Sequence, residues 1–263
     1  MRFYKEIRLF ALAFIILMLV GATRLVIRGQ EEKNSQSGSK ADITEEQVPV
    51  AIYDDVIARA NSSAVNDENK QKTELRMLRN GRYDKSYTVE EFPPYITVTP
   101  RSANWVADVP SIPVTQCNVA LIGEVSDARA FLSNDRTGIY SEFTITAEKI
   151  LKSDVDINQG QSVIAERAGG SVRFPSGNIQ RIYVFRGQRM PSLHNRYLFF
   201  LKRNETEETY TLLTGYAIQD GKISSLDNIQ PYLSYTNSNE DYFLSLVKNL
   251  IAGAKANDAT FVR

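Results

Sequence analysis

The sequence predicts a mainly β protein, a small antiparallel barrel or sandwich with short helices before it and one packing helix after it. Three observations lead to this fold class. Short segments with alternating or continuous apolar residues recur between about residues 117 and 217, a pattern typical of strands. Turn residues separate these segments at the spacing of barrels and sandwiches. The chain then ends with the three- and four-residue apolar spacing of an amphipathic helix.

The first 29 residues predict an address outside the cytoplasm. Met1–Arg8 is basic, and the uncharged apolar run Leu9–Ala22 follows it, which is the pattern of a secretory signal. Leu25–Ile27 extends the run toward the ~20 residues that span a membrane. A cleaved signal and a retained anchor both stay open. We therefore expect an inner-membrane-anchored, periplasmic or secreted protein that meets the membrane through this segment.

Residues 30–114 predict a segment without a core of its own. Its polar start favours a tether, Pro49 suits the first turn of a helix, and five prolines near its end favour an extended connector. A domain boundary is expected near Val114, with the β domain at 115–263. The predicted parts are a tether, two short helices and a connector, at Gln30–Lys40, Pro49–Ala60, Asn66–Arg79 and Phe92–Pro113.

Seven segments after this boundary predict strands. Tyr140–Leu151 alternates between apolar and polar residues, as a half-buried strand does. Tyr197–Leu201 is apolar on both faces, which favours a central strand. The predicted strands are Cys117–Val125, Tyr140–Leu151, Gln161–Arg167, Val172–Phe174, Ile179–Arg186, Arg196–Lys202 and Tyr210–Ala217.

The C-terminal helix has a clear start. Ser238 or Asn239 suits the cap, and acidic residues follow in the first turn. An apolar stripe, which predicts packing on the barrel, is formed by Phe243, Leu246, Val247 and Leu250.

Short motifs of the β region carry a resemblance to known proteins. They are Gly123–Val125, Leu132–Asp135, Tyr140–Thr144, Ile150–Lys152, Gly169–Gly170, Arg173–Gly177, Arg196–Lys202 and Leu213–Tyr216. With these motifs the region resembles an uncharacterised family of exported bacterial proteins and, more weakly, the OB-like barrels of netrin or metalloproteinase-inhibitor type. The resemblance implies an OB-like barrel and an envelope location, and it implies no catalytic residues.

Composition limits the function classes. The net charge is zero, so no overall field favours nucleic acid, and no aromatic residues alternate with the cations. A chain with one cysteine and one histidine forms no internal disulfide and no Cys/His zinc site. We expect no nucleic-acid partner, no metal and no cofactor.

Two local features have competing interpretations. Cys117 and His194 form a nucleophile–base pair if the fold brings them together; otherwise Cys117 is a buried structural residue and His194 a solvated turn residue. Ser133–Gly138 lacks the ligand spacing of a calcium loop and favours an Asx-type turn.

The most informative local feature is a run of cations without acidic residues. Arginine suits phosphate and carboxylate groups, so one interpretation is a surface for an anionic lipid, an envelope polymer or an acidic protein. The other is internal pairing with Glu142, Glu148, Glu166 or the acidic segment Glu205–Glu208. We place a rim cluster at Arg173, Arg186, Arg189 and Arg196 and expect Arg181 to pair internally. The eight cations are Arg167, Arg173, Arg181, Arg186, Arg189, Arg196, Lys202 and Arg203.

Taken together, these features predict a non-enzymatic binding or structural module of the cell envelope. The alternatives are an extracytoplasmic hydrolase that uses Cys117 and His194, and a barrel that inhibits a protease.

Overall fold

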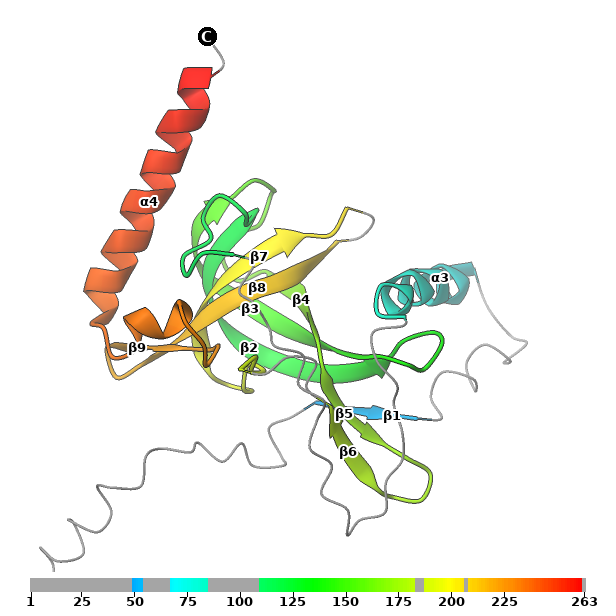
Figure 1. The fold of residues 1–263 in the computed structure, drawn as a ribbon. Helices are drawn as coiled ribbons and strands as arrows, with labels where there is room; N and C mark the ends of the chain where they lie inside the picture. The colour runs from blue at the N-terminus through cyan, green and yellow to red at the C-terminus, as the bar shows by residue number, and fades with distance from the viewer. Residues whose placement is uncertain (1–48, 54–66, 85–108, 183–186, 206–207, 262–263) are drawn as a thin grey trace, which may run out of the picture. The chain divides into compact units, whose positions relative to one another are not determined.

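The computed structural model describes residues 49–53, 67–84, 109–182, 187–205 and 208–261. Contacts between Cα atoms group Thr44–Arg263 into one compact unit, and Figure 1 shows how its described elements are arranged. The predicted domain boundary near residue 114 stays a prediction. The predicted signal or anchor and the tether lie outside the described residues.

Five strands close into a ring, which confirms the predicted mainly β class. β4 (Ser162–Ala168), β3 (Ile139–Ser153), β2 (Val119–Leu132), β7 (Arg196–Arg203) and β8 (Thr209–Gln219) are hydrogen-bonded in that order. A further pairing of β4 with β8 closes the ring, and it is parallel whereas the other four are antiparallel. This is the connectivity of a small five-stranded Greek-key barrel.

The interior of the ring is filled with apolar side chains. Phe143 and Ile145 of β3 meet Phe199 and Leu201 of β7 there, and all four are fully buried. The alternate residues of β7, Leu198 and Phe200, belong to a second cluster on the outer side. This explains why the sequence of β7 is apolar on both faces.

Helix α4 (Glu240–Phe261) covers that outer side of β7 and its neighbours, as predicted (Figure 1). Phe243 and Val247 are fully buried. The side-chain oxygen of Asn239 accepts a hydrogen bond from the Tyr242 amide at 3.1 Å, which is the expected cap. The stripe differs from the predicted one in one place because Leu250 is 40% exposed. Among the residues of α4 whose burial the structure describes, the buried ones are Phe243, Leu244, Val247 and Ile251.

A second sheet corrects one predicted helix. β1 (Val50–Ile52), β5 (Gly170–Arg173) and β6 (Ile179–Ile182) pair in the order β1-β5-β6. Residues 50–52 of the predicted Pro49–Ala60 helix are thus a strand, because Ala51 is buried in a core cluster with Val172 while its backbone pairs with β5. The rest of that predicted helix lies outside the described residues.

The remaining elements are short or lie outside the ring. β9 (Lys222–Ser225) pairs with β8, and the 3-10 helix η2 (Tyr232–Tyr235) follows it. α3 (Asp67–Gly81) confirms the second predicted helix. Its Met77 and Leu78 are exposed and its Leu75 is half-buried. Among the described helices, none combines the length and the apolar character needed to cross a bilayer.

Candidate functional site

Two buried carboxylates lie directly opposite each other on the outer face of the barrel. Glu142 of β3 pairs in register with Glu166 of β4, and the residues are 8% and 0% exposed. Their chain neighbours Phe143 and Ala165 face the interior, so the carboxylates face outward. Opposed like charges on neighbouring strands destabilise a sheet, so this pair requires cations.

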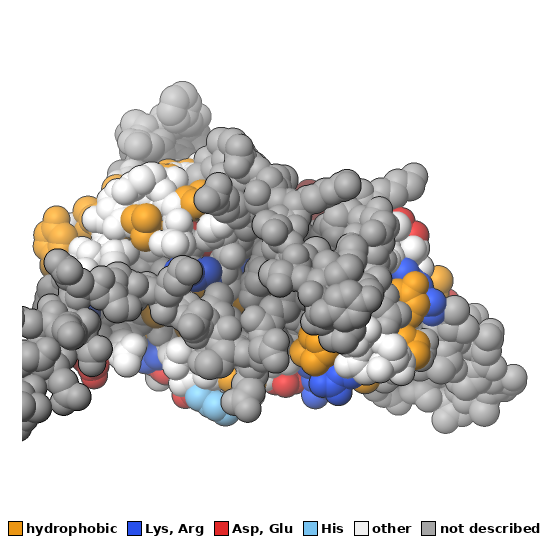
Figure 2. Space-filling view, turned by 60° about the horizontal axis from the view of Figure 1, so that its bottom comes forward, with side chains coloured by type: hydrophobic (Ala, Val, Ile, Leu, Met, Phe, Trp, Pro, Cys, Tyr) orange, Lys and Arg blue, Asp and Glu red, His pale blue; other side chains and the backbone are white. Residues whose placement is uncertain are grey.

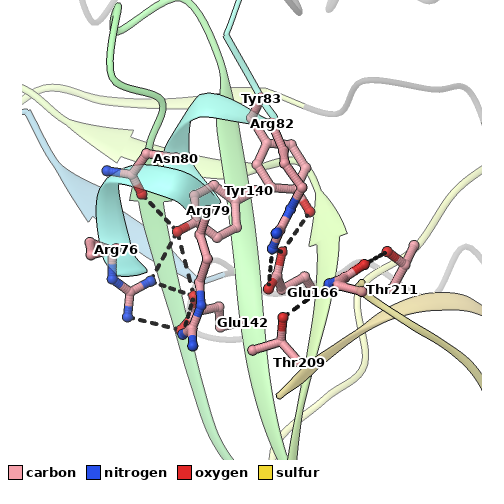
Figure 3. A network of polar contacts seen from close by, with 11 residues as sticks. Arg76, Arg79, Asn80, Arg82, Tyr83, Tyr140, Glu142, Glu166, Thr209 and Thr211 are labelled. Carbon is pink, nitrogen blue, oxygen red and sulfur yellow. Dashed lines mark hydrogen bonds and ion pairs between the residues drawn. The ribbon is translucent and has the colours of Figure 1, made fainter. Parts of the chain in front are cut away.

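Helix α3 and the turn after it supply these cations from outside the barrel (Figure 3). Arg76 pairs with Glu142, with its second nitrogen 3.2 Å from the other carboxylate oxygen. Arg79 lies 3.4 Å from Glu142, and Arg82 donates to both oxygens of Glu166 at 2.7 and 2.6 Å. Arg76 and Arg79 are three residues apart and lie on the same side of α3, and Arg82 lies in the turn that follows the helix.

Aromatic rings complete the contact between α3 and the barrel. The rings of Tyr83 and Tyr140 stack with centroids 4.2 Å apart and planes 5° apart. The Tyr83 hydroxyl donates to Glu166 at 3.2 Å, and the Tyr140 hydroxyl donates to Asn80 at 2.8 Å. The guanidinium of Arg76 lies 3.8 Å above the ring centre of Phe131, which is a cation–π contact.

The electrostatics of this cluster suit binding more than proton transfer. Burial, and then the charge of Glu166, raise the pKa of Tyr83. Burial also raises the pKa of Tyr140. Burial lowers the pKa of Arg76, but the contacts with Glu142 and Tyr140 outweigh it, and the net pKa is raised. Near neutral pH the tyrosines are therefore neutral and the arginine is charged.

Paired carboxylates also occur in glycoside hydrolases, where they act as acid and base or nucleophile. Here the oxygens of Glu142 and Glu166 are engaged by guanidinium groups and a phenol. Arginine is not deprotonated in proteins. The two carboxylates therefore hold guanidinium groups in fixed positions, which differs from the acid, base or nucleophile roles of such pairs in glycoside hydrolases.

A second polar cluster joins the two strands that close the ring. Arg167 of β4 donates to Asp227 at 2.6 Å, and both side chains are almost completely buried. Asp227 also accepts from Thr214 of β8 at 2.9 Å, and Arg167 donates to the carbonyl of Arg189 at 2.8 Å. This cluster links β4, β8 and the segments that follow β6 and β9.

The predicted arginine rim is only partly described. Arg196 donates to Glu148 at 2.6 Å and to Glu240 at 3.1 Å, so it follows the internal-pairing alternative. Arg173 is exposed at the end of β5, Arg189 is half-buried, and Arg186 lies outside the described residues. The side chain of Arg181 also lies outside them. A rim that binds anions therefore stays a prediction.

The structure does not bring Cys117 and His194 together. The Cys117 side chain is buried, and burial raises the pKa of its thiol to about 11. His194 lies at the surface (Figure 2), 77% exposed, and its backbone amide donates to Val125. Cys117 and Val125 lie near opposite ends of the β2–β7 ladder, roughly 25 Å apart at about 3.3 Å per residue.

The loop Ser133–Gly138 is a turn, as predicted. Asp135 accepts hydrogen bonds from the hydroxyls of Ser133 and Thr137 and from the Thr137 amide, at 2.7 to 3.0 Å. Within the described ranges, no group of three acidic, cysteine or histidine side chains is placed to hold a metal ion.

Sequence reasoning missed the α3 arginines as site residues. Their signal was present, because an arginine recurs every third residue, at Arg76 and Arg79 in the predicted helix and at Arg82 just after it. Glu142 also has the outward position in an alternating strand. The missing information was the register that places Glu166 opposite Glu142 and the face of the barrel on which α3 lies.

No protein-family model matches the chain, and no curated protein or solved structure matches it. The resemblance to exported bacterial proteins and to netrin-type barrels therefore stays a prediction.

Proposed function

We propose that this chain is a non-enzymatic binding module of the cell envelope, with its barrel outside the cytoplasm. The observation that carries the proposal is the outer face of β3 and β4. Its carboxylates and rings hold side chains of a separate segment, α3, by charge-assisted hydrogen bonds and stacking. The interior of the barrel is filled by its own side chains, so binding takes place on the outside.

The groups that favoured a hydrolase do not support that alternative. A nucleophilic cysteine needs a lowered pKa and a base within reach. Cys117 has a raised pKa and its sulfur faces the carbonyl of Val114 at 3.7 Å. The extracytoplasmic address is supported by the basic start and the apolar run Leu9–Ala22.

Two measurements on the full chain test this proposal. A reporter enzyme that is active only outside the cytoplasm, fused after Arg263, is expected to be active. A photo-crosslinking residue at Leu78, which is 55% exposed on α3, is expected to form an adduct with an envelope protein in irradiated cells. The matched control is Tyr242, which is 65% exposed on α4. An inactive reporter contradicts the location outside the cytoplasm. Equal yields of crosslinked adduct at Leu78 and Tyr242 contradict a binding surface near α3.

A further inference from the structure

We propose that the outer face formed by Phe131, Tyr140, Glu142 and Glu166 binds arginine side chains on a helix of a partner protein, and that α3 occupies this face in cis. We call these four residues the arginine seat. The proposal rests on the proposed binding function and names the chemical class of its ligand. The segment in place shows what fits, because α3 and the turn after it, Arg82–Asp84, place three guanidinium groups and one phenol there (Figure 3).

The chemistry of the seat selects arginine over lysine. Arg76 reaches both oxygens of Glu142 through two different nitrogens, a two-point contact that a planar guanidinium makes and an ammonium does not. Arg82 reaches both oxygens of Glu166 through one nitrogen. The guanidinium carbon of Arg76 also lies 3.8 Å from the centre of the Phe131 ring, and arginine favours such contacts with aromatic rings. A lysine helix keeps the charge and loses these contacts.

The seat fits the C-terminal end of a helix. Arg76 and Arg79, three residues apart in α3, both contact Glu142 of β3. Arg82 lies in the turn after the helix, where its amide donates to the Arg79 carbonyl at 3.1 Å, and its side chain reaches Glu166 of β4. A helix followed by such a turn therefore presents arginines to carboxylates on two adjacent strands.

Polar and aromatic contacts attach α3, so its removal exposes little of the core. Met77 and Leu78 are 54% and 55% exposed. α3 and the turn after it also contact the β2–β3 turn, where Asn134 donates to the Met77 carbonyl at 2.8 Å and Asp84 accepts from the Asp135 amide at 3.0 Å. Glu142 and Glu166 lie on the outer face, so water replaces the arginines when α3 leaves. A partner segment with the same side chains can then bind to the arginine seat in place of α3.

The test uses a fluorescent peptide with the sequence of residues 67–84 and the full chain in three forms. In the wild type, α3 competes with the peptide at the high effective concentration of a tethered segment. The variant R76Q/R79Q/R82Q weakens this competitor and keeps the seat, so the peptide should bind at least about tenfold more tightly. Adding E142Q/E166Q removes the carboxylates and should abolish binding. A peptide with lysine in place of its three arginines should bind more weakly than the arginine peptide.

Three results overturn the proposal: equal binding to the wild type and the glutamine variant, binding that survives E142Q/E166Q, or equal binding of the two peptides. If the glutamine variant loses the circular-dichroism spectrum of the wild type, R76K/R79K/R82K replaces it, and its affinity for the arginine peptide should lie above that of the wild type. An affinity at or below the wild-type value again overturns the proposal. The reporter and the Leu78 crosslink do not use the peptide, so the binding function and its ligand class can fail separately.

Discussion

Replacing Asp227 with asparagine tests how the ring is closed. The substitution keeps the shape of the side chain and removes its charge, and Arg167 is then left buried without an ionic partner. In the structure Asp227 is fully buried, and it accepts from Arg167 at 2.6 Å and from Thr214 at 2.9 Å. Breaking one side of a buried ion pair costs about 3–5 kcal/mol. For a domain of this size that corresponds to a decrease of roughly 6–20 °C in Tm.

The assay is urea denaturation followed by far-ultraviolet circular dichroism, with Asp127→Asn as the matched control. Asp127 also pairs with an arginine, Arg129, at 2.7 Å, but the two side chains are 45% and 72% exposed. Exposed pairs contribute about 0–1 kcal/mol, so the control should unfold almost as the wild type does. If Asp227→Asn lowers the free energy of unfolding by less than about 1 kcal/mol, or if the two variants lose the same amount, the reasoning about how Arg167 and Asp227 close the ring is refuted.

Three further predictions concern the core. Cys117 should resist thiol reagents at pH 8 until the chain is unfolded, and Cys117→Ala should cost about 1–2 kcal/mol. Because the pKa of the thiol rises from 9.0 to about 11 on folding, the neutral thiol contributes stability below pH 9, and this contribution is lost as the pH rises to about 11. Rapid labelling of Cys117 in the native chain contradicts its burial. Phe243→Ala should lower the free energy of unfolding by about 3–5 kcal/mol. Tyr242→Ala, at an exposed position of the same helix, should lower it by about 0.5 kcal/mol or less. Similar urea midpoints for the two variants contradict the packing of α4 on the barrel. Gly123→Ala should lower the free energy of unfolding by about 1–3 kcal/mol, because the new Cβ meets the Thr146 carbonyl oxygen at 2.6 Å. Gly253→Ala in α4, where the new Cβ has nothing within 4 Å, should raise it by up to about 1 kcal/mol. A Gly123→Ala variant that melts at a higher temperature than Gly253→Ala contradicts the strand packing.

The sequence was sufficient to predict the positions of β2 to β8 and of the C-terminal helix, but not β9. Alternation in β3 and the two-sided apolar run of β7 reflect local geometry, since side chains alternate on a strand. β1 was not predictable in this way. Pro49 and the four-residue spacing of the apolar pair Ile52 and Val56 favour a helix. Val50–Ile52 form a strand only because they pair with β5, which is distant in the sequence.

The site was harder to predict than the fold because it depends on contacts between distant segments. Glu142 and Glu166 are separated by a turn and part of two strands, and their opposition is set by the β3–β4 register. Arg76 and Arg82 reach them from 66 and 84 residues away in the sequence. Proximity in the sequence instead indicates the cations from Arg167 to Arg203, of which Arg167 and Arg196 form internal ion pairs.

The central claim is that the arginine seat holds α3 through its carboxylates. The most direct measurement is a double-mutant cycle between Arg82 and Glu166, using R82Q, E166Q and the double variant. The readout is hydrogen exchange of the α3 backbone amides, which reports the free energy for opening the helix. The account predicts a coupling energy of at least about 1 kcal/mol between the two residues, within the range for contacting groups. A coupling below about 0.3 kcal/mol, the level of independent sites, contradicts it.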